Sequence, residues 1–306
     1  DVTLSIAKTA QPAPGETLRY YYHENVYRPS AESHTFQEIS QMGLEMLGAV
    51  GEAQVQQAVR LAAQSLAQLG AAWVLEVSHM GYLFGLFDAL GVPENARPGL
   101  LEKLREKNAH ELRRAAQAAG LDAAGADALT GLLELSGSCE ETLAKAENAC
   151  RNDRMRAAAA ELRALAKTLE ASGGAVRLDL SLAGEMEYYN GLVFQGYLQG
   201  LPRPLLKGGR YDLLMQKFTP GAGAIGFAVY LDELDRLSAP TPPVQRNSTD
   251  RVMLNVALPK GRLGDKMYDL LARIGYGCTE DYNATRKLVV ENPAAGIRYF
   301  LVKPSD

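Results

Sequence analysis

Two stretches near the N-terminus combine tyrosine-rich and apolar residues in runs that are typical of β-strands. Residues 18–27 are rich in tyrosine, and residues 36–47 are mostly apolar. Aromatic and apolar side chains of this kind fit a pleated, half-buried surface. A polar stretch, residues 29–34, lies between the two runs. The pattern therefore predicts two strands that pair back across a polar loop.

The pattern changes to helical spacing over residues 51–172. Alanine, leucine, glutamate and arginine dominate, with apolar residues three and four positions apart. Glycines punctuate the stretch into several helices. Within it, residues 74–77 predict a short strand, residues 78–81 the start of the next helix, and residues 151–170 one long alanine-rich helix. Nothing in the helical stretch demands a catalytic role.

Strand-like alternation returns after residue 176 and predicts strands at 176–180, 192–197 and 225–230. Residues 208–212 predict a turn that leads into a helix at 213–218. Glycines at both ends of 221–226 predict a flexible turn. Asp232 is expected to open a further helix.

A proline-rich, polar stretch, residues 239–250, predicts a linker between two domains. After it, the pattern predicts strands at 252–257, 287–290 and 297–302, a loop at 258–263 and a helix at 264–274. We therefore expect a first domain at 1–238 and the opening of an α/β unit at 251–306, which stops too soon to close a core.

Composition and charge exclude several classes of protein. With 47% hydrophobic and 22% charged residues, the chain resembles ordinary globular proteins. A formal net charge of −4 argues weakly against a dedicated nucleic-acid binder. No apolar stretch reaches the roughly 20 residues of a membrane helix, and no signal peptide is visible. The three cysteines, Cys139, Cys150 and Cys278, lack metal-ligand spacing. They predict reduced thiols in a cytoplasmic protein without a bound metal, although Cys139 and Cys150 could pair.

Both ends of the chain suggest a longer sequence. The first residue is Asp1 rather than methionine, and Asp306 follows an apolar run. We expect a fragment.

One group of residues predicts an amino-acid pocket. Gln41, Gly43 and Glu45 alternate along one predicted strand, so their positions share one face of the sheet. A carboxylate beside an amide suits an ammonium group, and the paired Tyr188 and Tyr189 offer hydroxyls and rings to an imidazole. Taken singly, each residue is better explained as a solvated strand residue or a core aromatic.

Two basic sites carry weaker signals. Arg28, which follows a predicted strand, could bind a carboxylate or phosphate with two hydrogen bonds, but a surface arginine is the simpler interpretation. Lys260, Gly261 and Arg262 lie between a predicted strand and helix, where a helix N-terminus favours anions. The spacing is not that of a Walker loop, and an ordinary strand–helix loop explains it equally.

The motif Glu187-Tyr188-Tyr189-Asn190-Gly191 resembles the histidine-binding motif of histidyl-tRNA synthetases. Further stretches resemble that family in the same order: 1–3, 25–28, 36–48, 75–81, 187–194, 208–212 and 226–228. The resemblance implies a class II synthetase-like α+β fold with an antiparallel sheet, a helical insertion at about 82–172 and a homodimer. It also implies that histidine is held by Asp1, Thr3, Arg28, Gln41, Glu45, Tyr188 and Tyr189.

Three departures from the family pattern affect charge. Gly184 stands where the family has a catalytic arginine, and an uncharged residue cannot stabilise developing negative charge. Pro29 and Ser30 follow Arg28 where the pattern has Arg-x-Glu. Glu233 stands where an arginine would contact ATP phosphates, and a carboxylate there repels triphosphate. The departures predict a histidine pocket with no catalytic residues of its own.

A family with this combination is that of the regulatory subunits of ATP phosphoribosyltransferase, which are synthetase-like proteins of histidine biosynthesis. Residues 255–263, 286–293 and 297–306 resemble the N-terminus of the catalytic subunit itself, whose fold is like that of periplasmic binding proteins. This resemblance implies that Lys260, Arg262 and Arg286 meet ATP or phosphoribosyl pyrophosphate, with Mg²⁺ needed only in a complete catalytic domain.

Three functions therefore remain open. The first is a non-catalytic regulatory subunit that binds histidine, needs no cofactor in its own domain and assembles with a catalytic subunit. The second is a bifunctional regulatory and catalytic fusion in a longer chain. The third is an active synthetase-like enzyme.

Overall fold

The computed structural model describes residues 2–29, 36–169, 175–184, 188–238, 254–259, 262–278 and 289–302. The chain divides into two compact units, residues 1–239 and 240–306. Each unit has its own hydrophobic core among the described residues.

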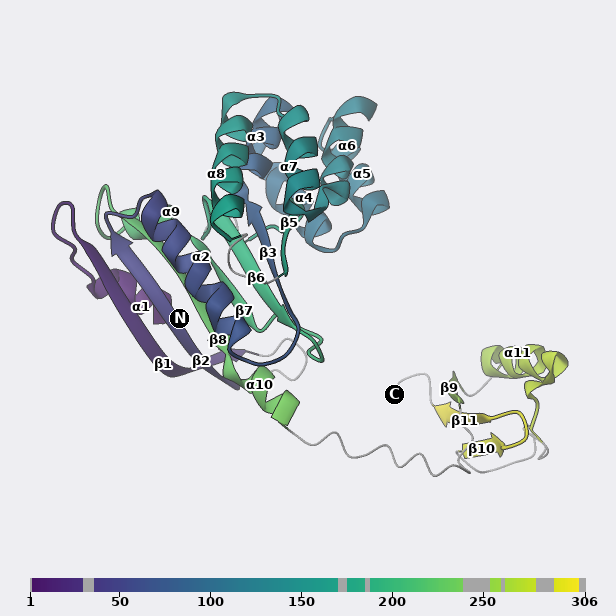
Figure 1. Ribbon diagram of the computed structural model, residues 1–306. Helices are drawn as coiled ribbons and strands as arrows, with labels where there is room; N and C mark the ends of the chain where they lie inside the picture. The colour runs from purple at the N-terminus through teal and green to yellow at the C-terminus, as the bar shows by residue number, and fades with distance from the viewer. Residues whose placement is uncertain are drawn as a thin grey trace. The chain divides into compact units, whose positions relative to one another are not determined.

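An eight-stranded sheet forms the centre of the first unit (Figure 1). In spatial order its strands are β1 (Thr17–Pro29), β2 (Phe36–Gly48), β8 (Gly223–Tyr230), β7 (Leu206–Arg210), β6 (Leu192–Leu198), β3 (Trp73–His79), β5 (Ala175–Asp179) and β4 (Ser136–Ser138). Neighbours are antiparallel except β3 and β5, which are parallel. The sheet is therefore mixed: most of the predicted antiparallel pairing is present, and the pair of β3 and β5 departs from it.

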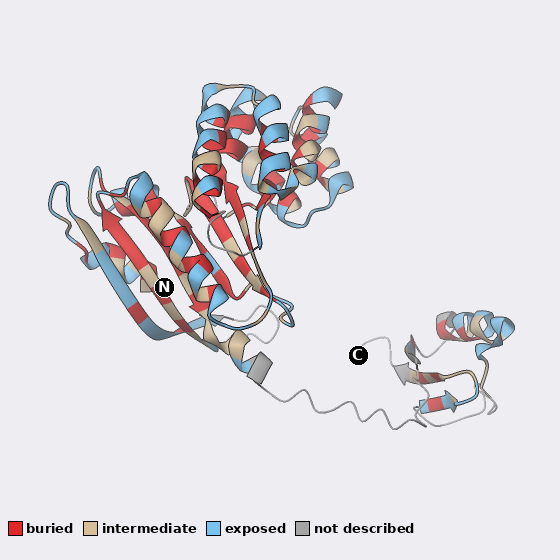
Figure 2. Cartoon of the chain, viewed as in Figure 1, coloured by how far each residue is buried: buried red, intermediate tan, exposed pale blue. Residues whose placement is uncertain are grey.

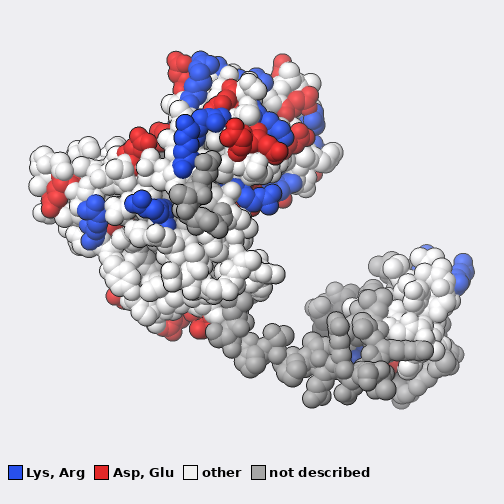
Figure 3. All heavy atoms as spheres, in the orientation of Figure 1, with Lys and Arg blue, Asp and Glu red and all other residues white. Residues whose placement is uncertain are grey.

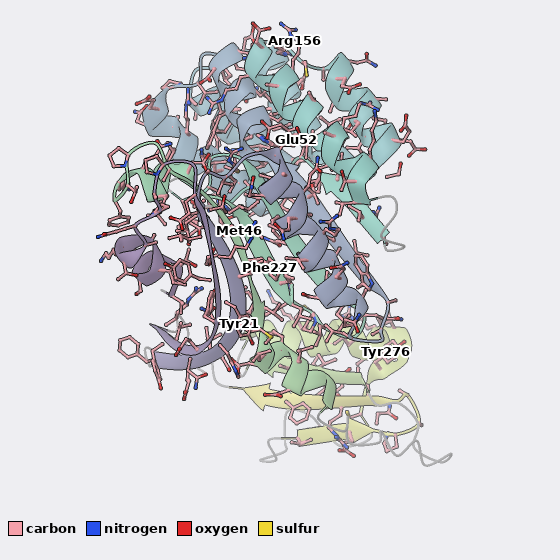
Figure 4. All side chains as sticks on the ribbon, turned by 60° about the vertical axis from the view of Figure 1, so that its left-hand side comes forward. Tyr21, Met46, Glu52, Arg156, Phe227 and Tyr276 are labelled. Carbon is pink, nitrogen blue, oxygen red and sulfur yellow. The ribbon has the colours of Figure 1, made fainter. Side chains whose placement is uncertain are left out.

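Helix α2 (Glu52–Ala67) covers one face of the sheet (Figure 1). Its buried residues recur with helical spacing, which gives an apolar stripe against the strands and an exposed outer side (Figure 2). The strands below contribute Met46 and Phe227, which lie on the neighbouring β2 and β8 (Figure 4). On the opposite face, Ala7 of α1 (Val2–Thr9) and Met215 of α9 (Asp212–Gln216) share a smaller core with Leu47.

Side chains along β2 point alternately to the two faces of the sheet, so some contact α2 and others contact α1 and α9. Met46 is buried in the core beneath α2, whereas the next residue, Leu47, is buried against α1 and α9. Since successive side chains of a strand point to opposite faces, Gln41 and Glu45 belong to the α1 face. This places them where the candidate site forms.

A helical region fills most of the chain between β3 and β5. It consists of α3 (Met80–Ala89), the short turn η1 (Glu94–Ala96), α4 (Arg97–Arg105), α5 (Ala109–Ala118), α6 (Ala123–Thr130), η2 (Gly131–Glu134), α7 (Cys139–Asn148) and α8 (Asp153–Leu169). Helices α7 and α8 pack against β5 and β3. In the view of Figure 3, basic and acidic side chains are intermixed over this region.

The predicted first two strands and the long helix predicted at 151–170 are confirmed. The strand predicted at 74–77 is β3, and the helix predicted to start within 78–81 is α3, which begins at Met80. Two turns were wrong: residues 208–210 lie in β7, and β8 already begins at Gly223. The short strand β4 was not expected. Helix α10 (Leu231–Ser238) begins one residue before Asp232.

In the second unit, a three-stranded sheet has the order β10 (Val289–Asn292), β11 (Ile297–Val302), β9 (Leu254–Pro259). Strands β9 and β11 are parallel, and α11 (Arg262–Leu271) with its continuation η4 (Ala272–Tyr276) follows β9. Leu258, Tyr268, Val290, Ile297 and Tyr299 form its buried core.

The predicted linker, at 239–250, lies outside the described residues. None of the three cysteines forms a disulfide. Among the described residues, no helix is long and apolar enough to cross a membrane.

Candidate functional site

A cavity of about 350 Å³ opens on the α1 face of the first unit. Strands β1, β2, β6, β7 and β8 form its floor, and α1 contributes one residue. Ala183 and Gly184, together with Tyr188 and Tyr189, form a wall. Its lining is Thr3, Tyr22, Arg28, Gln41, Glu45, Arg105, Ala183, Gly184, Tyr188, Tyr189, Gln195, Lys207, Tyr211, Gly226, Phe227, Ala228 and Tyr230.

Among the described residues that line this cavity, the acidic one is Glu45, which is 2% exposed. Its Oε1 accepts a hydrogen bond from the Thr3 hydroxyl at 2.7 Å, and its Oε2 accepts one from the Tyr211 hydroxyl at 2.5 Å. Burial raises the pKa of Glu45 to about 7, although both hydrogen bonds act in the opposite direction. The carboxyl is therefore poised between its neutral and ionised forms near neutral pH.

Gly226 makes room for this carboxyl. It lies directly opposite Glu45 in the β2–β8 pair. A Cβ at residue 226 would lie 1.7 Å from Oε2 of Glu45 and 2.5 Å from the backbone oxygen of Leu44. Only glycine leaves the acidic side chain in its present place.

Tyrosine rings surround Glu45. Tyr188 packs edge to face on Tyr189, with ring centroids 4.8 Å apart, and lies 5.4 Å from the ring of Tyr211. Burial and then the charge of Glu45 raise the pKa of Tyr22 and of Tyr211 well above their usual range. Burial likewise raises the pKa of Tyr188, against a hydrogen bond with Thr3. The phenols are therefore neutral and serve as hydrogen-bonding groups.

Gly184 is packed against one of these rings. A Cβ at residue 184 would lie 2.6 Å from Cδ2 of Tyr189 and 3.2 Å from the Val193 side chain. The ring of Tyr189 thus occupies the space that any larger side chain at this position would need.

Arg105 brings a positive charge to the same wall from the last residue of α4. Its Nε donates to the carbonyl oxygen of Ala183 at 3.2 Å, and its Nη2 donates to that of Gly184 at 2.6 Å. Arg28 and Lys207 also line the cavity. Among the described residues that line the cavity, three basic side chains and one buried carboxyl suit a zwitterionic or anionic ligand.

Six of the seven predicted histidine-binding residues line this one cavity: Thr3, Arg28, Gln41, Glu45, Tyr188 and Tyr189. Their role in binding stays a prediction. Asp1 lies outside the described residues, as do Lys260 and Arg286. Arg262 begins α11 of the second unit. Glu233 lies in the first turn of α10 and is not among the residues that line the cavity.

Sequence reasoning missed Arg105, Lys207, Tyr22 and Tyr211. Tyr22 carried a detectable signal, because it lies directly opposite Gly43 in the strand pair that the sequence predicts. Arg105 carried none, since it reaches the cavity from a helix that looked purely structural. Among the described residues, no group of histidine, cysteine and acidic side chains could hold a metal ion.

The mixed sheet with its helices is the fold of class II tRNA synthetases. The model of the histidyl-tRNA synthetase family matches residues 1–234, so the chain belongs to this family. A crystal structure of a histidine–tRNA ligase subunit from Alicyclobacillus acidocaldarius is 31% identical in sequence to this chain, with a TM-score of 0.64. The match covers 78% of this chain and 76% of the ligase chain.

Other relatives of this chain are named ATP phosphoribosyltransferase regulatory subunit. That of Desulfitobacterium hafniense (strain DSM 10664 / DCB-2) is 34% identical over 217 residues, which are 70% of this chain and 56% of the relative. A crystal structure of an ATP phosphoribosyltransferase regulatory subunit/histidyl-tRNA synthetase from Bacillus halodurans C is 26% identical, with a TM-score of 0.66. The match covers 99% of this chain and 78% of the Bacillus chain. The chain spans little more than half the length of the Desulfitobacterium relative.

Proposed function

We propose that this protein is a regulatory subunit of ATP phosphoribosyltransferase, the enzyme of the first step of L-histidine biosynthesis, and that its cavity binds L-histidine. The observation that carries the proposal has two parts: the cavity has a polar lining, and the space for an arginine side chain at residue 184 is occupied. Glu45, Gln41 and the tyrosines line the cavity, while the ring of Tyr189 occupies the space beside Gly184.

The chemistry of the cavity suits histidine. Ionised Glu45 offers a carboxylate to the ligand's ammonium group, and Gln41, which is 3% exposed, offers an amide on the same strand face. The hydroxyls of Tyr188 and Tyr189 offer hydrogen bonds to an imidazole, whose ring fits an aromatic wall. A ligand that binds one state of an assembly more tightly than another shifts the assembly toward that state. Bound histidine would thus report product level to the catalytic subunit.

We propose further that the first unit is not catalytic and needs no cofactor. Activation of an amino acid by ATP needs positive charge near the reacting phosphate, and Gly184, the Pro29–Ser30 pair after Arg28 and Glu233 all depart from the family pattern in that respect. The names of the relatives support a regulatory role and imply a catalytic ATP phosphoribosyltransferase subunit as partner. We also propose a homodimer, no binding of nucleic acid and a cytoplasmic location.

For the second unit we propose the beginning of a catalytic ATP phosphoribosyltransferase domain. Its parallel β9 and β11, with α11 after β9, are the start of an α/β layer. Arg262 begins α11, and a helix N-terminus favours phosphate. We propose that Arg262, together with Lys260 and Arg286, binds ATP or phosphoribosyl pyrophosphate. A complete catalytic domain of this kind would use Mg²⁺. The names of the relatives do not favour the alternative of a bifunctional fusion.

Isothermal titration tests the main proposal. We expect L-histidine to bind with a Kd in the micromolar range and L-leucine to give no heat, because leucine lacks the imidazole that the tyrosines would bind. A folded protein that gives equal heats with both amino acids contradicts the proposal. Pyrophosphate exchange with histidine and ATP is the second measurement: exchange above background would establish an active synthetase-like enzyme instead.

A further inference from the structure

We propose that Arg105, from the helical region, binds the carboxylate of the cavity's amino-acid ligand and so selects an amino acid over its carboxylate-free analogues. The proposal rests on the proposed binding of histidine. It assigns a specific role to a residue that lies outside every motif of the sequence and reaches the site only through the fold.

The guanidinium of Arg105 is fixed in place at the cavity wall. Its two hydrogen bonds go to consecutive backbone carbonyls, those of Ala183 and Gly184. A guanidinium has five N–H groups in a planar fork, and these bonds use two of them. The other three have no partner among the residues that the structure describes. The remaining donors are both N–H groups of Nη1 and one N–H group of Nη2. One N–H from each of these nitrogens can donate to a carboxylate, which gives two parallel hydrogen bonds.

A second contact holds the end of α4 against the same part of the sheet. Lys107, two residues after Arg105, donates from Nζ to Oδ2 of Asp179 at 2.6 Å. Asp179 is 2% exposed, and its Oδ1 accepts from the backbone and hydroxyl groups of Ser181. Arg105 and Lys107 thus both bind the stretch from Asp179 to Gly184, and Arg105 arrives at the cavity already oriented. A preorganised donor loses little entropy when a ligand binds.

The charge of Arg105 also complements that of Glu45, which lines the same cavity. Glu45 lies on the sheet floor with Thr3 and Tyr211, whereas Arg105 lies on the wall with Gly184. An α-amino acid carries its ammonium and carboxylate on one carbon, so a pocket that takes the ammonium at Glu45 needs a cation that the carboxylate of the same ligand can reach. Since Tyr189 blocks any large side chain at residue 184, the cation on this wall comes from α4.

The test compares two ligands on the full-length protein by isothermal titration calorimetry. L-histidinol keeps the imidazole and the ammonium of histidine but has a hydroxymethyl group in place of the carboxylate. We expect the wild type to prefer histidine and Arg105→Met to lose about ten- to hundredfold in affinity for histidine, with its affinity for histidinol unchanged. Arg105→Lys should recover only part of the preference, because lysine lacks the fork.

Two controls separate this role from damage to the fold. Lys103→Met removes a charge from the same helix, where Lys103 contacts Glu106 rather than the cavity, and should leave both affinities unchanged. Arg28→Met tests the other arginine of the cavity. If Arg28→Met abolishes the preference while Arg105→Met keeps it, the assignment to Arg105 is wrong. An equal loss for both ligands in Arg105→Met likewise contradicts a carboxylate contact.

The result also distinguishes this inference from the function on which it rests. A wild-type protein that binds neither ligand overturns both. A wild type that binds histidine while Arg105→Met binds it equally well leaves the proposed function intact and overturns only the role of Arg105.

Discussion

At the scale of single residues, the buried carboxyl of Glu45 makes stability depend on pH. Its pKa is 4.5 in the unfolded reference and about 7 in the folded protein, because burial disfavours the charged form. Between pH 4.5 and 7 the folded protein keeps a proton that the unfolded chain loses. The free energy of unfolding contributed by this group is complete below pH 4.5 and falls by about 3 kcal/mol as the pH rises through 7.

We therefore expect Glu45→Gln to flatten the pH profile of stability, since an amide stays neutral throughout. Urea unfolding at pH 5, 6, 7 and 8 measures this: the wild type should lose about 3 kcal/mol over the range and the variant much less. Glu94→Gln, which removes an exposed carboxyl of the turn η1, is the matched control and should follow the wild type. Parallel profiles for wild type and Glu45→Gln would contradict a shifted pKa at Glu45.

The same scale gives a prediction for Gly184. Restoring an arginine with Gly184→Arg places a Cβ 2.6 Å from the ring of Tyr189, so the ring must move. We expect a loss of about 1–3 kcal/mol in stability, as for other overpacked positions, and no pyrophosphate exchange. Chemical unfolding and the exchange assay measure both. A variant as stable as the wild type that exchanges pyrophosphate would show that the missing arginine alone separates this chain from an active synthetase.

Sequence reasoning succeeded for residues whose partners are set by local geometry. Gln41 and Glu45 share a face because strand side chains alternate, and both line the cavity. It failed for Arg105, whose contacts with Ala183 and Gly184 span 78 and 79 residues of sequence. Such a contact depends on how a helical region packs against a sheet, and no periodicity in the chain encodes it.

At the scale of elements, the glycines of β7 and β8 explain why two turns were wrongly predicted. The glycine pair Gly208 and Gly209 predicts a turn, yet both residues lie inside β7. A Cβ at residue 208 would lie 2.5 Å from the backbone oxygen of Gly226, and one at residue 209 would lie 2.6 Å from the ring of Tyr189. These glycines allow strands and rings to approach closely, a use that a single sequence does not distinguish from a turn.

We expect Gly226→Ala to disrupt the site from within its own strand. The new methyl group would collide with Glu45 Oε2 and with the backbone of β2, and the backbone cannot rotate away. Stability should fall by about 1–3 kcal/mol or more, and histidine binding should be lost because Glu45 must move. Unfolding in urea and calorimetric titration measure the two effects.

The matched control lies in α4, where Gly99 has open space around its Cβ position. Gly99→Ala should raise stability by up to about 1 kcal/mol, because alanine is the better helix former, and should leave histidine affinity unchanged. A Gly226→Ala variant that binds histidine as the wild type does would contradict this prediction. The position of Glu45 would then not depend on the absence of a side chain at residue 226, and the close packing of β2 on β8 would not define the cavity.

At the scale of the whole molecule, the order of elements along the chain was predictable, but the pairing of strands distant in sequence was not. The two-strand start and the helical middle follow from patterns that extend over a few turns or strands. The pairing of β3 with β5 joins Val74 to Ala175 across the entire helical region. Because no local pattern specifies a partner a hundred residues away, the parallel pair that makes the sheet mixed appeared only in the structure.

The two units should unfold separately, because their cores share no residue among those described. The core of the first unit runs through the sheet, α2 and the helical region, whereas five residues form that of the second. A core of that size supplies little stability by itself, so the second unit should unfold first. Differential scanning calorimetry of the full chain should therefore show two transitions.

Histidine then tells the two transitions apart. A ligand that binds only the folded first unit adds about 2.7 kcal/mol to its stability at a hundred times the Kd, so the upper transition should rise by several degrees. The lower transition should stay where it is, since its unit holds none of the cavity residues. L-Leucine at the same concentration is the control. If histidine instead raises both transitions together, the units unfold as one cooperative body, and histidine bound in the first unit already acts on the stability of the second.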